Sequence, residues 1–224
     1  MTGKATRVAL VEDHLLLAQS LCFALDAEGF DPVIVRIPPE VTHASALLDP
    51  VLDTGAAVTL LDLDLGHAGQ ALPLIGPLAA AGVCVCVVTG AADPTQWGEC
   101  LANGAKAVLP KAAALEEIVN TVRETLAGRQ VITETQRYEL VQRWYRHQSG
   151  LQGARARLDR LSPREAQVLA ALAEGRRVRQ IAAEAFVSEA TVRSQVKSIL
   201  AKLGVSSQIA AVATANALGW RGAS

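Results

Sequence analysis

Residues 161–205 read LSPREAQVLAALAEGRRVRQIAAEAFVSEATVRSQVKSILAKLGV, and this stretch decides the fold of the C-terminal part of the chain. Ser162 is a suitable helix cap, proline follows at the first helical position, and Glu165 lies three residues after the cap, which completes a capping box. Apolar residues then recur at helical spacing up to Gly175, where the helix ends. A short second helix and a turn at Ser188 follow. The pattern predicts a compact all-α helix-turn-helix unit.

The third helix of this unit, predicted over Thr191–Leu203, has two unlike faces. Its apolar residues share one face and are expected to be buried. Its opposite face carries cations and no acid, which suits a helix that enters the major groove of DNA. The apolar face consists of Val192, Val196, Ile199, Leu200 and Leu203, and the polar face of Arg193, Ser194, Gln195, Lys197, Ser198 and Lys202.

The segment resembles the helix-turn-helix domain of the LuxR/NarL (FixJ) family. The shared features are LSPRE, the Ile-Ala pair of the second helix, VSEATV and ILAKLGV, all at fixed spacing. The resemblance implies a domain over 161–224 that binds double-stranded DNA, as a homodimer when active. The alternative is a helical protein-interaction module with a solvated charged face. The DNA contacts that the resemblance implies come from Arg179, Thr191, Arg193, Ser194, Lys197 and Lys202.

The distribution of charge separates the chain into two parts. Residues 1–128 hold 6 Lys and Arg against 15 Asp and Glu, while the remaining residues hold 15 against 7, so the net charges are -9 and +8. A basic C-terminal part favours a polyanionic partner. We expect a cytoplasmic protein without membrane segments, because no 18-residue apolar run or signal-peptide pattern is found. The four cysteines and four histidines show no metal-ligand spacing and are expected to have no ligand role.

The N-terminal part alternates short apolar runs with helical segments. Regular alternation of this kind predicts a five-stranded parallel sheet, doubly wound by helices in the flavodoxin-like manner. The five predicted strands are Val8–Val11, Val33–Ile37, Val58–Leu63, Val83–Val88 and Ala107–Leu109, and the predicted helices cover 15–28, 42–54, 69–81, 94–103 and 115–127.

Chemically active side chains follow four of the predicted strands. Glu12 and Asp13 end the first strand, Asp62 the third, Thr89 the fourth and Lys111 the fifth. The carboxyl ends of parallel strands meet at one edge of the sheet, so we expect these side chains to converge there. Clustered carboxylates favour Mg²⁺, and a hydroxyl with an ammonium suits the oxygens of a phosphoryl group. The pattern indicates phosphoryl transfer to an aspartate.

This part of the chain resembles the receiver domain of response regulators over about residues 5–128. The resemblance implies that Asp62, in the sequence LLDLDL, is the phosphoacceptor. It also implies that Thr89 and Lys111 contact the phosphoryl group. The implied Mg²⁺ ligands are Glu12, Asp13, Asp62 and the backbone carbonyl of Asp64.

An enzymatic alternative comes from Asp62-Leu63-Asp64, which is similar to the DxDx(T/V) motif of haloacid-dehalogenase-type phosphatases. Gly66 replaces the Thr or Val of that motif, and the acid pair precedes the nucleophile, so we expect no enzyme. A second alternative is a regulator that binds DNA without phosphorylation. Gly66 and Val108 favour it, because they stand where receivers generally have Pro and often have a rotating aromatic residue.

The predicted domain organisation is a receiver domain over 1–128, a partly helical linker over 129–160 and a helix-turn-helix domain over 161–224. The linker has an apolar patch at Leu140, Val141, Trp144 and Tyr145, and glycines at 150 and 153 are expected to loosen it. It is either a solvated tether or a helix that packs against a domain or its dimer mate and transmits the phosphorylation state. The sequence thus predicts a response regulator of a two-component system, phosphorylated at Asp62 by a sensor histidine kinase, that regulates transcription.

Overall fold

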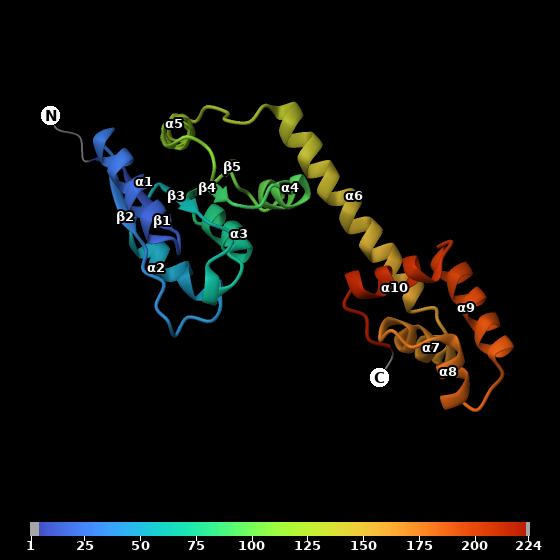
Figure 1. The fold of residues 1–224 in the computed structure, drawn as a ribbon. Helices are drawn as coiled ribbons and strands as arrows, with labels where there is room; N and C mark the ends of the chain where they lie inside the picture. The colour runs from blue at the N-terminus through green and yellow to red at the C-terminus, as the bar shows by residue number, and fades with distance from the viewer. Residues whose placement is uncertain (1–4, 223–224) are drawn as a thin grey trace. The chain divides into compact units, whose positions relative to one another are not determined.

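The computed structural model describes residues 5–222. The chain divides into two compact units, Met1–Tyr145 and Arg146–Ser224. Helix α6 (Glu134–Leu158) contributes to both of them. Figure 1 shows a sheet with flanking helices in the first unit and helices alone in the second.

The first unit contains the predicted five-stranded parallel sheet, with strand order β2-β1-β3-β4-β5. Helices cover both faces, which confirms the doubly wound fold. One face carries α1 (Leu15–Ala27) and α5 (Leu115–Leu126), and the other carries α2 (Leu48–Asp53), α3 (Leu72–Ala80) and α4 (Pro94–Ala102). The strands are β1 (Arg7–Val11), β2 (Asp31–Ile34), β3 (Val58–Leu61), β4 (Cys84–Thr89) and β5 (Ala107–Pro110).

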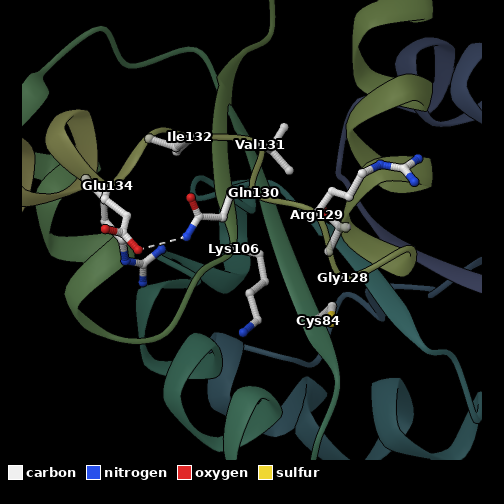
Figure 2. A pocket seen from close by; sticks show the side chains of 10 residues that line it. Cys84, Lys106, Gly128, Arg129, Gln130, Val131, Ile132 and Glu134 are labelled. Carbon is white, nitrogen blue, oxygen red and sulfur yellow. Dashed lines mark hydrogen bonds between the residues drawn. The ribbon is translucent and has the colours of Figure 1, made fainter.

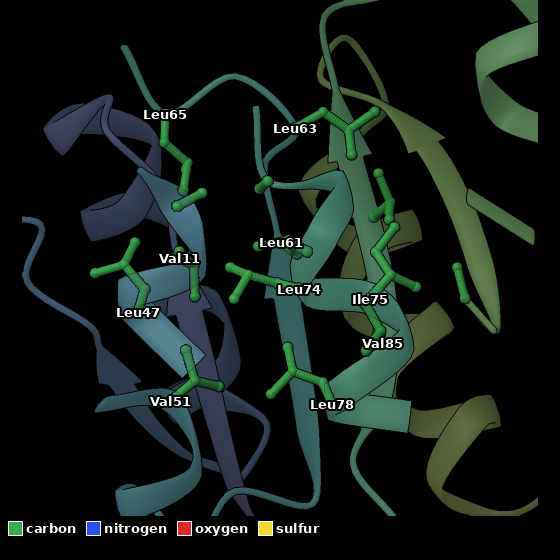
Figure 3. Close-up of a cluster of buried hydrophobic side chains, with 14 of the residues drawn as sticks. Val11, Leu47, Val51, Leu61, Leu63, Leu65, Leu74, Ile75, Leu78 and Val85 are labelled. Atoms are coloured by element: carbon green, nitrogen blue, oxygen red, sulfur yellow. The ribbon is translucent and has the colours of Figure 1, made fainter. Parts of the chain in front are cut away.

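Successive side chains of each strand point to opposite faces of the sheet, so the first unit has two separate apolar cores. In β1, Val8 and Leu10 belong to the core beneath α1 and α5, while Ala9 and Val11 belong to the core on the opposite face. Figure 3 shows the second of these cores, where side chains of α2 and α3 meet those of β1 and β3. Burial on both faces explains why the strands read as nearly continuous apolar runs.

Two predicted helices differ from the observed ones. The segment predicted as 69–81 becomes helical only at Leu72, because residues 66–68 form a short 3-10 turn, η2 (Gly66–Ala68), beside the sheet edge. The segment predicted as 42–54 begins with a 3-10 turn, η1 (Ala44–Leu47), before α2. The second predicted strand is also shifted, since β2 ends at Ile34.

Up to residue 222, the second unit consists of the end of α6 and four further helices around one apolar core. They are α7 (Pro163–Ala173), α8 (Val178–Glu184), α9 (Glu189–Leu203) and α10 (Gln208–Ala217). The predicted capping box at Ser162 and Glu165 is present. The third helix begins two residues earlier than predicted, because the Ser188 side chain accepts from Thr191 N and thereby caps it.

The segment predicted as a partly helical linker contains the 25-residue helix α6. The expectation that Gly150 and Gly153 loosen it was wrong, because the helix continues through both glycines. No single helix within residues 5–222 is long and apolar enough to cross a membrane. The consecutive pair α9 and α10 passes the same test jointly, by length and composition alone, with a bend of 58° between them.

Candidate functional site

Two carboxylates and one ammonium meet at the carboxyl ends of three strands. Glu12 follows β1, Asp62 follows β3 and Lys111 follows β5. Lys111 Nζ donates hydrogen bonds to Asp62 Oδ2 at 2.7 Å and to Glu12 Oε1 at 2.8 Å. Both carboxylates are buried, whereas Lys111 is partly exposed. The parallel topology therefore brings these three side chains into direct contact, although Glu12 and Lys111 are 99 positions apart in the sequence.

Burial and neighbouring charges act in opposite directions on Asp62. Burial raises the pKa of Asp62, the hydrogen bond from Lys111 lowers it, and the charge of Glu12 raises it; the net pKa is above the usual value. Burial lowers the pKa of Lys111, but the hydrogen bonds to Asp62 and Glu12 outweigh that effect and raise it. The site thus holds the protonated form of Lys111 beside the poorly solvated carboxylate of Asp62.

Asp13 and His14 extend the cluster toward solvent. His14 Nδ1 lies 2.8 Å from Asp13 Oδ1 and 3.1 Å from Glu12 Oε1. Glu12, Asp13, His14 and Asp62 each offer a ligand atom, and these atoms lie within 4.8 Å of one another. His14, for which the sequence predicts no ligand role, thus lies beside the acid cluster in the structure. Adjacency to the acid pair was the one available signal for it. The oxygen-rich donor set is chemically suited to a hard divalent cation.

Two further predicted site residues are Thr89, which ends β4, and Asp64, which follows Asp62 by two positions. Thr89 is the last residue of β4 and is buried, and its Oγ1 accepts a hydrogen bond from Ala91 N at 3.1 Å. Asp64 N donates to Asp62 Oδ1 at 3.3 Å. Asp64 Oδ1 accepts from Gly66 N at 3.2 Å, so the Asp64 carboxylate is turned toward the loop that follows β3.

Gly66 lies in this loop and has a left-handed backbone conformation, which glycine adopts more easily than other residues. Its φ is +57°, and a Cβ at this position would lie 2.8 Å from Asp13 Oδ2. A proline, the usual residue here in the family that the sequence resembles, could not adopt this φ. Beside it, a cavity of about 610 Å³ is lined by Glu12, Asp13, Arg36 and other residues of the same edge. The acid cluster is therefore accessible to a small solute.

The exposed side of α9 presents the side chains predicted to contact DNA. Arg193, Ser194 and Lys197 are exposed, and Arg193 pairs with Glu189 at 3.1 Å on the same helix. Val192, Ile199 and Leu203 are buried in the core, while Val196 and Leu200 pack against it partly buried. Thr191 lies in the first turn next to the Ser188 cap, and Arg179 is exposed on α8.

Lys202 has a partner that the sequence did not reveal. Its Nζ donates to Glu165 Oε2 at 2.6 Å, and Ser198 Oγ donates to Glu165 Oε1 at 2.6 Å. Glu165 also accepts from Ser162 N. Burial raises the pKa of Glu165, but the hydrogen bonds from Lys202, Ser198 and Ser162 outweigh it and lower the pKa to about 2. A buried glutamate on α7 therefore fixes α9 by two contacts.

Figure 2 shows a second cavity, of about 370 Å³, at the amino ends of β4 and β5. Cys84 and Lys106 line it together with residues 128–132 and Glu134, and Gln130 donates to Glu134 at 3.2 Å. It contains none of the predicted site residues. The amino ends of parallel strands lie opposite the edge that carries Asp62, so this cavity is separate from the acid cluster.

Comparison with known proteins identifies relatives of both units. Residues 159–215 match the family described as bacterial regulatory proteins, luxR family. The probable transcriptional regulatory protein NarL of Mycobacterium tuberculosis is 30% identical over 215 residues, which cover 93% of each chain. The transcriptional regulatory protein DesR of Bacillus subtilis is 25% identical over 214 residues, which cover 95% of this chain and 98% of DesR.

Among solved structures, the RcsB response regulator of Salmonella typhimurium resembles this chain with a TM-score of 0.51 at 23% identity, over 96% of this chain and all of RcsB. A structure of an RcsB–DNA complex gives a TM-score of 0.50 at 23% identity, again over 96% and 100%. At this identity the likeness concerns the fold, and it extends over both units.

Proposed function

The chain belongs to the LuxR/NarL family of response regulators, and from this premise we propose that it is a transcription regulator controlled by phosphorylation of Asp62. The contact of Lys111 with both Asp62 and Glu12 at the sheet edge carries the proposal. It supplies a nucleophilic carboxylate and a fixed cation at one place. In this organisation residues 1–128 form the receiver domain, 129–160 the linker and 161–224 the DNA-binding domain.

In the proposed reaction an Asp62 oxygen attacks the phosphorus of a phosphorylated histidine on a sensor kinase. The new Asp62 O–P bond replaces the P–N bond, and the histidine nitrogen leaves with the electron pair. Lys111 donates to a phosphoryl oxygen as the negative charge shifts, and the Thr89 hydroxyl turns from Ala91 to donate to another. Burial of Asp62 keeps its carboxylate poorly solvated and thus available for attack.

Glu12, Asp13, Asp62 and the Asp64 carbonyl are the residues that would hold Mg²⁺ here. The donor set fits that ion, because carboxylate oxygens from Glu12, Asp13 and Asp62 lie within 4.8 Å of one another beside an accessible cavity. When bound, Mg²⁺ supplies positive charge that offsets the repulsion between these acids and the phosphoryl oxygens. His14 occupies the solvent side of the same cluster.

The proposed output is binding of a homodimer to double-stranded DNA in the cytoplasm. Arg193, Ser194 and Lys197 face the major groove, where the guanidinium and ammonium groups reach base edges. Thr191, Arg179 and Lys202 contact phosphates around that groove. Lys202 can do so while it remains paired with Glu165, since an ammonium has three donors.

Intact mass after incubation with Mg²⁺ and acetyl phosphate tests the receiver chemistry. The protein should gain about 80 Da, the mass of one phosphoryl group. Asp62→Asn should not gain it, and EDTA should prevent the gain in the wild-type protein. A regulator that works without phosphorylation would show no gain under any of these conditions. Continuous hydrolysis of a phosphate ester, abolished by Asp64→Asn, would instead indicate a phosphatase.

A further inference from the structure

The cavity at the amino ends of β4 and β5, shown in Figure 2, is lined by three cations and one acid. The cations are Lys106, Arg129 and Arg137, and the acid is Glu134. Arg129 forms an ion pair with Glu124, so its charge is already compensated. The other lining charges are two positive and one negative. The cavity therefore has one excess positive charge, which favours a ligand with a single negative charge.

Lys106 supplies an unpaired ammonium to this cavity. It comes directly before β5, and its backbone N donates to Val85 O at 2.8 Å, which fixes the start of the side chain. Figure 2 shows the side chain among the residues that line the cavity. Among residues 5–222, no hydrogen bond or ion pair involves Lys106 Nζ. Its three N–H groups are thus available to an anion.

Arg137 is held beside the cavity by backbone carbonyl groups and not by an acid. Its Nη2 donates to Leu101 O at 2.8 Å, and its Nη1 donates to Ala105 O at 3.1 Å. Carbonyl groups carry no net charge, so the guanidinium keeps its full positive charge, and it has further N–H groups that can donate to a ligand. Because Arg137 is already fixed in place, a ligand that binds to it orders no additional side chain there.

Residues 128–132, which connect α5 to α6, also line the cavity and are anchored on both faces of the sheet. Val131 packs against the core beneath α1 and α5, and Ile132 packs against the core on the opposite face. The cavity of about 370 Å³ is therefore preformed. Preformed cavities of about 300–1,000 Å³ with apolar walls and a few polar groups are typical of small-molecule sites.

We propose that this cavity binds a small organic anion with one carboxylate and an apolar body. The carboxylate accepts from Lys106 Nζ and from the remaining N–H groups of Arg137, and these charge-assisted bonds fix its orientation. The apolar body contacts Val131, Ile132 and Cys84. Inorganic phosphate fits less well, because it makes no use of the apolar contacts. The site lies apart from the acid cluster, so this inference does not depend on the proposed phosphorylation.

Binding of benzoate to the full-length protein tests the proposal by isothermal titration calorimetry, in a buffer free of divalent cations and phosphoryl donors. Benzamide is the matched control, because it has the same shape without the charge. Inorganic phosphate is the control for an anion without an apolar body. We expect one saturable site for benzoate and dissociation constants at least about tenfold larger for both controls, since each lacks one of the two kinds of contact.

Lys106→Gln should weaken benzoate binding about tenfold, because it removes the ammonium from the cavity. Lys197→Gln is the matched control variant, since it removes the same charge from the exposed side of α9 in the second unit. It should leave the affinity for benzoate unchanged. Both lysines are exposed, so neither substitution disturbs a core.

Alkylation by iodoacetamide, followed by peptide mass spectrometry, locates the bound ligand. Cys84 lines the cavity, whereas Cys22, which is also partly buried, belongs to α1 and does not line it. At a benzoate concentration about ten times its dissociation constant, about one site in eleven is empty, so alkylation of Cys84 should slow about tenfold. The rate at Cys22 should stay the same.

Several results would overturn the proposal. One is the absence of saturable benzoate binding, and another is equally tight binding of benzamide or phosphate. Equal affinity of Lys106→Gln and the wild-type protein, or equal weakening in Lys197→Gln, would also overturn it. Benzoate that binds without slowing alkylation of Cys84, or that slows Cys22 as much, would lie at another place on the protein and contradict the assigned site.

Discussion

Lys111 Nζ lies 2.7 Å from Asp62 Oδ2, so the ends of β5 and β3 are joined by an ion pair at the centre of the candidate site. The same ammonium also neutralises Glu12. One cation is thus shared between two buried carboxylates, and burial raises the pKa of Asp62 in spite of this partner. The ionised form of Asp62 therefore destabilises the folded protein.

Asp62→Asn should therefore stabilise the first unit. Because the folded-state pKa of Asp62 is raised, the folded protein binds this proton more tightly than the unfolded chain, and the ionised carboxylate disfavours folding at pH 7. We expect a gain of about 1 kcal/mol in the free energy of unfolding, since Lys111 keeps Glu12 as its partner. Urea unfolding at pH 7 measures it. The difference should shrink as the pH falls through the pKa of Asp62, and a less stable variant at pH 7 would contradict the account.

Gly66→Ala should impair divalent-cation binding more than it impairs folding. The new Cβ would press on Asp13 Oδ2 and displace that carboxylate from the cluster. We expect that a higher Mg²⁺ concentration is needed for half-maximal phosphorylation. Gly69→Ala is the control, because Gly69 also has a positive φ, of +75°, but its Cβ would meet nothing within 4 Å. If Gly66→Ala and Gly69→Ala raise the required Mg²⁺ concentration equally, backbone strain and not the contact with Asp13 would be the cause.

Glu165→Gln should destabilise the second unit at neutral pH. Since the pKa of Glu165 is lowered to about 2, its contribution is fully present above the unfolded-chain value of about 4.3 and is lost as the pH falls toward 2. We expect a loss of about 2 kcal/mol at pH 7, because Lys202 and Ser198 lose a charged acceptor. Glu174→Gln, at an exposed pair with Arg176, should change stability by less than about 0.5 kcal/mol. Equal effects of the two variants would show that Glu165 contributes no more than a surface pair.

Arg193→Ala should relax the sequence preference of DNA binding. Its guanidinium is exposed on α9, and its surface ion pair with Glu189 is of a kind that contributes little stability, so it can exchange this partner for a guanine edge. We expect a loss of about 1–3 kcal/mol on the specific site and little change on random DNA. Lys202→Ala should instead weaken all sequences alike and reduce the salt slope by about one. Equal losses for Arg193→Ala on specific and random DNA would make Arg193 a phosphate contact.

Much of this architecture was predictable because local patterns and topology act together. Alternating apolar runs and helices predict a parallel sheet. Because the carboxyl ends of its strands share one edge, Glu12, Asp62 and Lys111 are placed there independently of the loop conformations. The helix starts at Ser162 and Ser188 follow from capping chemistry, which depends on a few neighbouring residues.

The remaining features depend on contacts between distant residues. Glu165 and Lys202 are 37 positions apart, and no periodicity links them. The positive φ of Gly66 follows from the path of the loop, which sequence patterns do not specify. Glycines at 150 and 153 were predicted to loosen the linker, yet their intrinsic penalty of about 1 kcal/mol each is small compared with what continuous helical hydrogen bonding provides.

The central claim is that phosphorylation of Asp62 controls DNA binding, and the dissociation constant for one DNA duplex tests it most directly. The duplex would be selected from a random pool by the protein treated with Mg²⁺ and acetyl phosphate, and binding followed by fluorescence anisotropy at fixed salt. We predict that phosphorylation tightens binding by about tenfold or more in the wild-type protein and not in Asp62→Asn. Equal affinity of the phosphorylated and unphosphorylated wild-type protein would contradict the account.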